Sequence, residues 1–506
     1  MRQDSTQAAA QAQRAVLLDS GPGGGQAEAT IPLARIGPPR ARASSMPWSR
    51  VRLGPLHGQL ALGVLVVASL VVVVFAASGP SVLVPASTIS FPNWEAGPLH
   101  GLIGRPIDDA TTLGLGWSAV LLAMLAAWGV ALASARSLSM RAIALCVVAL
   151  HVILLLSPPL QLNDVFNYIG YARLGALHHI NPYRGVIADE LRDPVFALTR
   201  WRNLPSPYGQ LFTALSYPLA FMSLPLAYWC LKVATVLSSL LFIVLVWRFA
   251  VALGRDPRLP VLFVAANPIL LMYEVAGFHN DFMMLIAMLA ALMLMQAGSD
   301  RAAGAAAAIA VAIKFSALLL LPFLLVAAPA AQRRTRILTG AALAAIPLVA
   351  LSLALFGVAQ PNLADQSTLL TEWSVPNVVG LLLGVGGTPA LLTFADVALV
   401  VSVIWLLRRR GELLVDFGWA TLALIASLAW LVPWYVVWLL PMAALGTSRR
   451  LRRAAAAITV YLLVAFMPAM ATLISRVNFD PMGTPPGRAS MSLQHKLSQG
   501  TTTLPR

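Results

Sequence analysis

The stretch Gln161-Leu-Asn-Asp-Val-Phe-Asn-Tyr-Ile-Gly-Tyr-Ala-Arg173 lies near the start of the longest polar interruption in a strongly apolar chain. This interruption covers residues 158–224 and begins with Pro158-Pro159, directly after an apolar run. It contains carboxylates, arginines and tyrosines, whereas the flanking segments are almost purely apolar. We therefore expect the flanking segments to form a scaffold and the interruption to carry the chemistry.

The composition is typical of a membrane protein. Of the 506 residues, 58% are hydrophobic and only 11% are charged, whereas soluble domains carry roughly 25% charged residues. Apolar runs of about 20 residues recur along the chain, which predicts an all-α polytopic membrane protein. A membrane β-barrel would show short alternating segments instead.

The net charge of +15 does not indicate a nucleic-acid partner. The basic residues are mostly arginines in short loops between apolar runs, where the orientation bias of membrane proteins places them. We therefore predict no nucleic-acid partner. The two cysteines, Cys146 and Cys230, lie in apolar stretches and are expected to be inert.

The apolar runs and the arginines predict a topology in the plasma membrane. Residues 1–55 are expected to be a disordered basic arm in the cytoplasm. Residues 56–476 are expected to form about 13 spans. Alternation then places the loop 158–224 on the outer face, with an interfacial helix at about 208–224. Residues 477–506 are polar and are expected to form a loose tail.

One segment is too short for the crossings that the topology requires. Residues 303–330 must leave and return to the cytoplasmic side, but two full spans need about 20 residues each. We therefore predict two short helices that meet at Lys314, with Pro322 in the second. Half-helices at membrane depth occur only around a cavity lined by protein. Lys314 either extends to water or binds a lipid-linked phosphate.

Asp164 is the leading candidate for a catalytic base. It follows the end of a predicted span by a few residues, so its carboxylate is expected near the outer surface. A carboxylate in such a place can accept a proton from an attacking hydroxyl group. Alternatively, Asp164 caps a helix that starts near Val165, although Asn163 can also serve as that cap.

A second polar group lies at the junction of two later spans. Glu274 falls inside an apolar run, and His279-Asn280-Asp281 follows it. Ionisable residues within spans are candidates for function, and His279 can donate a hydrogen bond to a phosphate. Capping of the next helix and pairing of Glu274 with a basic neighbour are the alternatives. A zinc site is less favoured because no second His or Cys has ligand spacing nearby.

Arginines and tryptophans of the predicted outer loops have two interpretations each. The arginines either bind an anionic partner or pair with loop carboxylates; they are Arg173, Arg184, Arg200 and Arg202. The tryptophans either form the interfacial belt or stack on sugar rings; they are Trp94, Trp201, Trp373 and Trp434. No phosphate-binding loop, dinucleotide fingerprint or nucleophile elbow occurs in a suitable context, so no nucleotide cofactor is predicted.

The order of several short motifs resembles a known family. The motifs are Asp164-Val-Phe-Asn-Tyr168, Asn181-Pro-Tyr183, Ser206-Pro-Tyr-Gly209, Asn267-Pro268, His279-Asn-Asp281, Lys314 to Pro322 and Pro433-Trp-Tyr435. Together they are similar to the actinobacterial polyprenol-phosphate-mannose-dependent α-1,6-mannosyltransferases of the MptA/MptB type, within the GT-C class of membrane glycosyltransferases. The resemblance covers residues 150–475. Gln210 departs from it, since proline is expected there, and this leaves the acceptor and subfamily open.

The resemblance implies a GT-C-like bundle and a mechanism. The donor would be mannose β-linked to a polyprenyl phosphate, and the acceptor a growing lipoglycan mannan. Asp164 would act as base in a single inverting step, and Lys314, His279 and Arg173 would bind the phosphate. Further residues would contact the substrates, namely Asp281, Asn280, Tyr168, Tyr208, Glu274, Trp434 and Tyr435. Neither a metal nor another cofactor is implied.

Other functions also fit an apolar chain with buried ions. A lipid-linked sugar transporter or flippase needs broken helices and intramembrane charges, but no internal repeat is evident. A structural component of an envelope complex is a third possibility. Within the transferase interpretation, arabinose or glucose remains an alternative to mannose.

Overall fold

The computed structural model describes residues 54–84, 91–104, 107–162, 164–361 and 368–498. All regular elements in these ranges are helices, and no strand occurs in them. An all-α protein is therefore confirmed for this part of the chain. The predicted N-terminal arm lies almost wholly outside the described residues.

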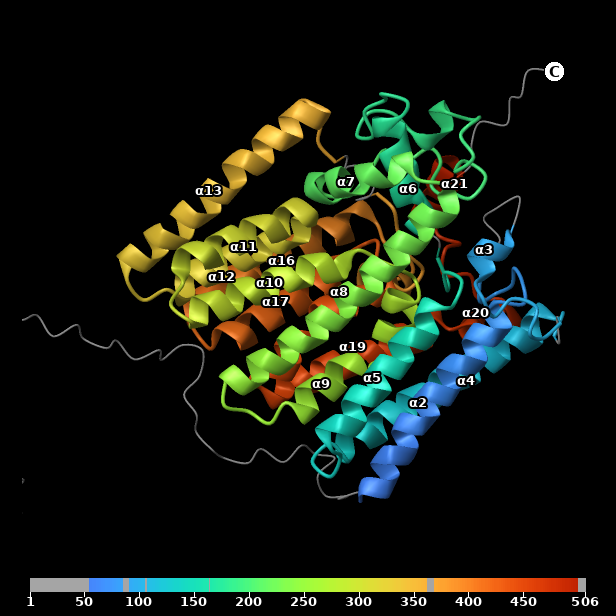
Figure 1. Ribbon diagram of the computed structural model, residues 1–506, viewed down its shortest axis with the longest axis horizontal. Helices are drawn as coiled ribbons and strands as arrows, with labels where there is room; N and C mark the ends of the chain where they lie inside the picture. The colour runs from blue at the N-terminus through green and yellow to red at the C-terminus, as the bar shows by residue number, and fades with distance from the viewer. Residues whose placement is uncertain (1–53, 85–90, 105–106, 163, 362–367, 499–506) are drawn as a thin grey trace, which may run out of the picture. The chain divides into compact units, whose positions relative to one another are not determined.

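Three helices at the N-terminal end pack together. They are α2 (Pro55–Ala76), α4 (Ala110–Ala133) and α5 (Met140–Leu155), and α2 contacts both others (Figure 1). The side chains of Asp109 and Ser139 accept hydrogen bonds from backbone N–H groups at the start of α4 and α5. Such caps satisfy donors that have no partner inside the helix, so they fix where each helix begins.

A second set of helices forms a layer in which each helix contacts the next. In spatial order they are α8 (Leu224–Ala252), α10 (Asp281–Gln296), α11 (Asp300–Ile313) and α13 (Ala331–Phe356) (Figure 1). Helix α13 lies at the edge of this layer, and only 17% of its most apolar 18-residue stretch is buried inside the protein. This leaves a large apolar surface of α13 uncovered by protein.

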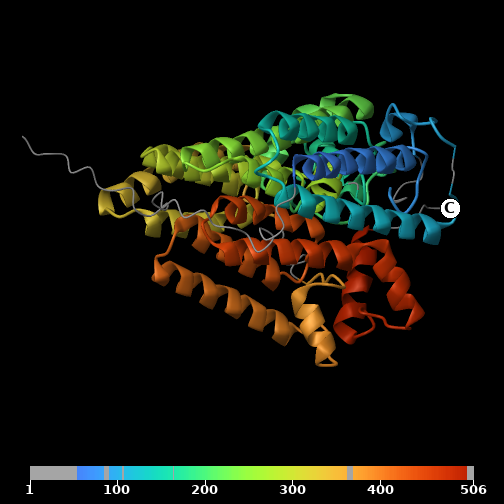
Figure 2. The same cartoon turned by 90° about the horizontal axis from the view of Figure 1, so that it is seen from below.

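The C-terminal third supplies another group of helices, drawn in orange and red in Figure 2. Its helices are α15 (Val375–Leu382), α16 (Pro389–Arg409), α17 (Leu413–Ser427), η6 (Pro433–Trp438), α18 (Leu440–Leu445), α19 (Arg449–Phe466) and α20 (Pro468–Arg476). Helix α16 contacts mainly α17, with smaller contacts to α15 and α12 (Leu320–Ala327), and only 6% of its apolar window is buried.

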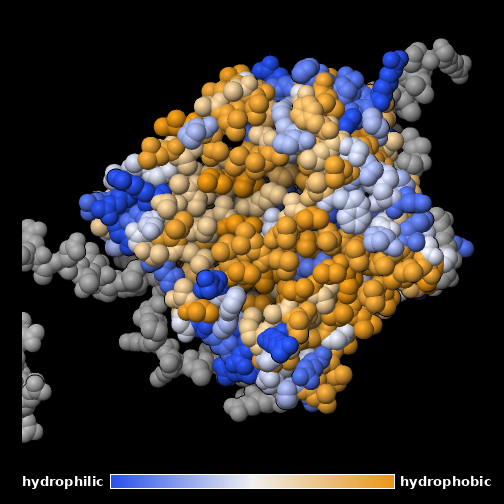
Figure 3. Space-filling view, viewed as in Figure 1, coloured by the Kyte–Doolittle hydropathy of each residue, from blue (hydrophilic) through white to orange (hydrophobic). Residues whose placement is uncertain are grey.

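The described helices fit a membrane-embedded protein. Five are long and apolar enough to cross a membrane, namely α2, α4, α8, α13 and α16, and the pair α19 and α20 makes up to six if it is one bent span. Further apolar helices are shorter, among them α5, α10 and α17. The space-filling view shows a broad hydrophobic area between hydrophilic groups at two sides (Figure 3). The predicted number of about 13 spans stays a prediction.

The helix break at Lys314 is confirmed. Helix α11 ends at Ile313, Lys314 is extended, and the chain continues as η5 (Phe315–Leu319) and α12 (Leu320–Ala327).

Two elements precede α10 in the chain, namely α9 (Arg258–Ala265) and the π-helical turn η4 (Leu270–Val275). Such π-helical turns often occur at functional sites.

The long polar interruption folds into short helices. Helix α6 (Asp164–Ala176) comes first, and α7 (Gln210–Ser216) with η3 (Tyr217–Phe221) occupies the segment for which a short interfacial helix was predicted. Two shorter elements lie in this loop and in the preceding one, η2 (Ile187–Asp189) and α3 (Asn93–Ala96).

The C-terminal segment differs from the expected loose tail. Residues Pro485–Ser498 form helix α21. Its Leu497 packs in one cluster with Leu204 and Leu369, and its Ser490 exchanges hydrogen bonds with the backbone of Leu370. The polar composition of the segment hid a helix with one buried face, and that face is what fixes it to the rest of the protein.

Candidate active site

One cavity collects most of the predicted site residues. It has a volume of about 370 Å³ and is enclosed by α6, the loop before α7, the turn before α10, the break at Lys314 and η6. Its walls include Asp164, Tyr168, Tyr208, His279, Asn280, Asp281, Lys314, Trp434 and Tyr435. Residues that are far apart in the sequence therefore form one pocket, as the resemblance requires.

Asp164 lines the cavity at the start of α6. It is the first helical residue of α6, and Asn163, the other predicted cap, lies outside the described residues. The side chain of Asp164 is 14% exposed, and its Oδ1 has no hydrogen-bond partner among the described residues. Burial raises the pKa of Asp164 to about 6, although the charges of Arg200 and Lys314 act in the opposite direction. A carboxylate with this pKa is ionised at neutral pH and still binds a proton well.

His279 lies beside Asp164 in a tight turn. Its Nδ1 is 3.7 Å from Oδ2 of Asp164, and its ring stacks on Trp434 with 4.1 Å between centroids. The preceding residue, Phe278, has a φ of 54°, which is unfavourable for a residue other than glycine. At Gly277 an added Cβ would lie only 2.1 Å from the carbonyl oxygen of Tyr273. Strained turns of this kind persist where the surrounding structure holds a functional side chain.

Lys314 supplies a fixed positive charge to the cavity. Its Nζ lies 2.6 Å from Oδ1 of Asp281, and the indole N–H of Trp438 donates to the same oxygen at 2.5 Å. The Lys314 ammonium group also lies 5.3 Å from the ring centre of Tyr435 and 5.1 Å from that of Trp438. Because Asp281 is 1% exposed, Lys314 forms a buried ion pair instead of extending to water. A cation held in this way can bind an anionic group without rearranging.

Aromatic rings and an amide complete the lining of the cavity. Tyr168 and Tyr208 meet edge to face at 4.8 Å, and Tyr435 stacks on Trp438 at 4.3 Å. The Asn280 amide nitrogen is buried and has no hydrogen-bond partner among the described residues. A donor in this position is available to a hydroxyl group of a bound sugar. Aromatic faces are suited to the apolar face of a sugar ring.

The cavity does not include Glu274 or Arg173. Glu274 is fully buried in η4, and both of its carboxylate oxygens lack hydrogen-bond partners in the part of the chain that the structure describes. The charged groups of Asp281 and Lys314 act on its carboxyl group, which therefore lies close behind the cavity wall.

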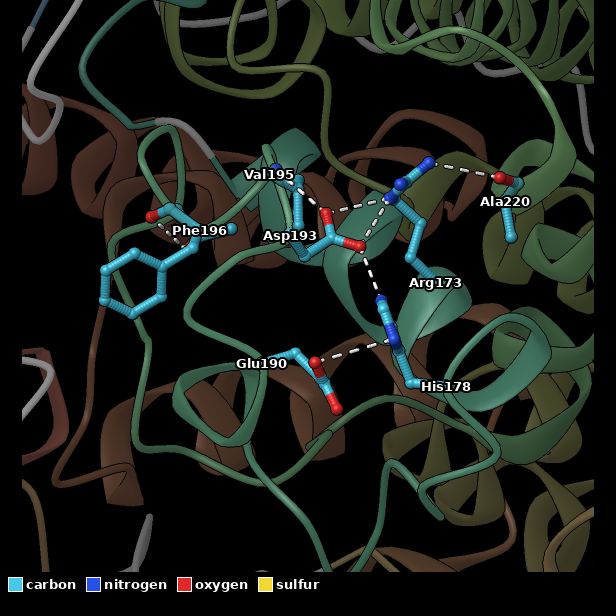
Figure 4. A network of polar contacts seen from close by, with 8 residues as sticks. Arg173, His178, Glu190, Asp193, Val195, Phe196 and Ala220 are labelled. Carbon is cyan, nitrogen blue, oxygen red and sulfur yellow. Dashed lines mark hydrogen bonds and ion pairs between the residues drawn. The ribbon is translucent and has the colours of Figure 1, made fainter.

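Arg173 belongs to a separate network in the outer loop (Figure 4). Its Nε donates to both carboxylate oxygens of Asp193 at 2.9 and 3.0 Å, and its Nη1 donates to the Ala220 carbonyl. His178 contacts the same carboxylate at 2.7 Å and Glu190 at 3.6 Å. Although burial favours the neutral acid, hydrogen bonds from Arg173 and His178 lower the pKa of Asp193. For Arg173 the ion pair within the loop is therefore the better interpretation.

Two cavity residues and one residue behind the cavity wall extend the predicted set of site residues. Arg200 and Trp201 line it, and Arg200 lies over the Trp201 ring at 5.7 Å. The sequence offered both among several loop arginines and tryptophans with two interpretations each, but did not indicate which of them faces the site. Trp438 had no signal, because its role depends on a hydrogen bond to Asp281, 157 residues away in the chain.

Trp94, which belongs to another predicted outer loop, packs against aromatic rings. Trp94 meets Phe166 and Tyr228 edge to face, at 6.1 and 5.3 Å between ring centres.

Among the described residues, no group of three or more His, Cys, Asp or Glu side chains is arranged to hold a metal ion. The cavity thus combines the Asp164 carboxylate, which has one oxygen without a partner in the described structure, two cations, Arg200 and Lys314, and several aromatic rings.

These features define a class of protein. A helical membrane protein whose cavity combines an available carboxylate, a fixed cation and stacked aromatic rings has the features of a membrane glycosyltransferase. Comparison with known proteins specifies the family. The model of the "Alpha-(1->6)-mannopyranosyltransferase, N-terminal domain" matches residues 60–330, and the "MptB C-terminal domain" matches residues 367–482. The chain therefore belongs to the MptA/MptB family of alpha-(1->6)-mannopyranosyltransferases.

Curated relatives agree with this assignment. An alpha-(1->6)-mannopyranosyltransferase of Mycobacterium tuberculosis is 31% identical over 29% of this chain and 26% of its own length. A probable alpha-(1->6)-mannopyranosyltransferase of Mycolicibacterium smegmatis is 27% identical over 64% of this chain and 70% of its own. Alpha-(1->6)-mannopyranosyltransferase A of M. tuberculosis is 25% identical over 62% and 67%. The match thus spans only about a quarter of the first relative. No solved structure matches this chain.

Proposed function

We propose that this protein transfers mannose from a polyprenyl-phosphate-mannose donor to a growing α-1,6-mannan of a cell-envelope lipoglycan. The observation that carries the proposal is the placement of the Asp164 carboxylate and the Lys314 ammonium group in one cavity, together with aromatic side chains. Family membership supports mannose over arabinose or glucose. The apolar helices support a lipid-linked donor, since such a donor is confined to the membrane.

The proposed reaction is a single displacement with inversion. A hydroxyl oxygen of the acceptor attacks the anomeric carbon of a β-linked mannosyl phosphate, and the new bond is an α-glycosidic bond. Asp164 takes the hydroxyl proton on Oδ1, which has no partner in the described structure. The bond from the anomeric carbon to the phosphate oxygen breaks, and polyprenyl phosphate leaves with the electron pair.

The leaving phosphate needs positive charge and no proton. Lys314 and Arg200 supply charge from two sides of the cavity, and His279 can donate a hydrogen bond. Positive groups that are already in place stabilise the developing charge without reorganisation. One carboxylate is sufficient here, in contrast to the two that glycosidases use. Asn280, Tyr168, Tyr208, Trp434 and Tyr435 would contact the sugars.

The topology belongs to the same proposal. The shorter apolar helices would complete a bundle of about 13 spans. The N-terminus would lie in the cytoplasm, and the cavity would face outward at the plasma membrane, because basic loops favour the cytoplasmic side. Cysteine substitutions in a loop at each end of α13, labelled by an impermeant reagent in intact cells, would test this orientation.

Product analysis tests the proposed reaction. Purified protein in lipid vesicles would receive β-mannosyl, β-glucosyl or β-arabinosyl polyprenyl phosphate with a synthetic α-1,6-mannoside acceptor. We expect transfer from the mannosyl donor only, with an α linkage in the NMR spectrum of the product. A β linkage would reject inversion. Movement of the intact donor across the vesicle without any covalent product would point to a flippase.

A further inference from the structure

A second hollow lies directly behind the wall that carries Lys314. Its volume is about 660 Å³, and it is formed by α7, α11, η5 and α13. No charged side chain lines it, and small or apolar residues predominate, among them Ala308, Val311, Phe315, Ala345, Leu348 and Val349. We call this hollow the α11–α13 groove. Since α13 is largely uncovered by protein, the groove adjoins the apolar surface seen in Figure 3.

The sequence explains why the groove exists. Helices α11 and α13 touch backbone to backbone at two glycines. A Cβ atom added to Gly304 would lie 1.9 Å from the carbonyl oxygen of Ile337. A Cβ atom added to Gly340 would lie 1.8 Å from the carbonyl oxygen of Arg301. Beyond these glycines both helices present alanines to each other, such as Ala308 and Ala345. Alanine side chains are too short to fill the space between two helices, so a channel remains open.

The groove ends at the candidate active site. Pro207 lines both hollows, and Ala312 and Phe315, which flank Lys314 in the chain, line the groove. A Cβ at Gly209 would lie 2.3 Å from the Ile313 carbonyl oxygen, so the two segments touch directly there. The groove and the cavity therefore adjoin at Pro207 and at the segment that carries Lys314. An apolar molecule in the groove can place a charged end beside Lys314.

We infer that the α11–α13 groove binds the polyisoprenyl chain of the lipid-linked sugar phosphate. The inference rests on the proposed function and deepens it. An apolar, uncharged groove beside the largely uncovered helix α13 suits a long hydrocarbon, and the Lys314 ammonium group in the adjoining cavity suits the phosphate. The branched chain of the donor thus lies between α11 and α13, and the anomeric carbon enters the cavity next to Asp164.

Donors of two chain lengths test the inference. Ala345→Trp and Ala308→Trp fill the groove, Ala345→Leu fills it partly, and Ala350→Trp adds the same ring at an exposed position of α13 outside it. Transfer would be measured with a long polyprenyl-phosphate-mannose and with its geranyl analogue. We expect the KM for the long donor to rise about tenfold in both groove tryptophan variants and less in Ala345→Leu, because apolar contact area is lost. The geranyl donor and Ala350→Trp should show no change.

The other outcomes reject either the groove or the function. Equal effects on both donors, or no effect on either, would overturn the groove assignment while the proposed function stands. A raised KM for a lipid-anchored acceptor alone would overturn it in favour of the acceptor's anchor. If the wild-type protein transfers mannose from neither donor, the proposed function fails. Retention of labelled polyprenyl phosphate then decides: the groove assignment stands if Ala345→Trp and Ala308→Trp lose it while the wild-type protein and Ala350→Trp retain it, and falls otherwise.

Discussion

The Nδ1 atom of His279 lies 3.7 Å from Oδ2 of Asp164, while Oδ1 of the same carboxylate has no hydrogen-bond partner within the described ranges. One oxygen therefore faces a ring that is itself stacked on Trp434, and the other is available to accept a proton. One carboxylate oxygen can therefore orient the side chain while the other takes part in the reaction. Variants of the surrounding groups should accordingly differ in their effects.

The pH dependence should follow the carboxylate of Asp164. Burial raises its pKa to about 6, so the base is increasingly protonated, and inactive, as the pH falls below that value. We expect kcat/KM to be flat near pH 7 and to fall about tenfold per pH unit below about 6. Arg200→Gln removes a charge that lowers this pKa, so its acid limb should lie at higher pH. A wild-type profile that stays flat down to about pH 5 would contradict the assignment.

Lys314 and Asp281 should behave as one unit in stability but not in activity. Lys314→Met leaves the buried Asp281 carboxylate without its cation, which typically costs about 3–5 kcal/mol. The double variant Lys314→Met, Asp281→Asn removes both charges and should regain much of the thermal stability. Transfer should remain low in both variants because the cation for the phosphate is missing. A double variant that regains activity with stability would assign Lys314 a purely structural role.

Substitution of Arg173 should affect the stability of the loop, whereas substitution of Arg200 should affect donor binding. Arg173→Gln breaks the ion pair with Asp193, so we expect a lower melting temperature and an unchanged donor KM. Arg200→Gln, at the cavity wall, should raise the donor KM and leave the melting temperature nearly unchanged. The two variants are matched in chemistry and loop location, so each is the control for the other. The reverse pattern would return Arg173 to the donor site.

The sequence predicted the parts of this protein that depend on local length and polarity. The helix break at Lys314 was predicted because its segment is too short for two spans. The position of Asp164 in the polar loop was predicted because it follows Pro158-Pro159 by a few residues. The partner of each arginine was not predictable, because Asp193 selects Arg173 through the folded loop. The same holds for Trp438, whose hydrogen bond to Asp281 joins distant segments.

The ordered tail shows a related limit. Helix α21 is polar in composition, and only Leu497 and a few other residues of it are buried. Whether such a segment packs depends on the surface that receives it, here near Leu204 and Leu369. Because Leu204 and Leu369 also line the cavity, α21 supports the site from outside. Composition alone does not contain that information.

The central claim is that Asp164 is the base of a mannosyl transfer. The most direct measurement compares kcat of the Asp164→Asn variant with kcat of the wild-type protein, both in vesicles with labelled polyprenyl-phosphate-mannose. Equal melting temperatures of the two proteins show that the variant is folded. The amide has nearly the same shape but does not accept the proton, so we predict that kcat falls about 10²–10⁴-fold with little change in donor KM. A kcat within about twofold of the wild-type value would contradict the claim.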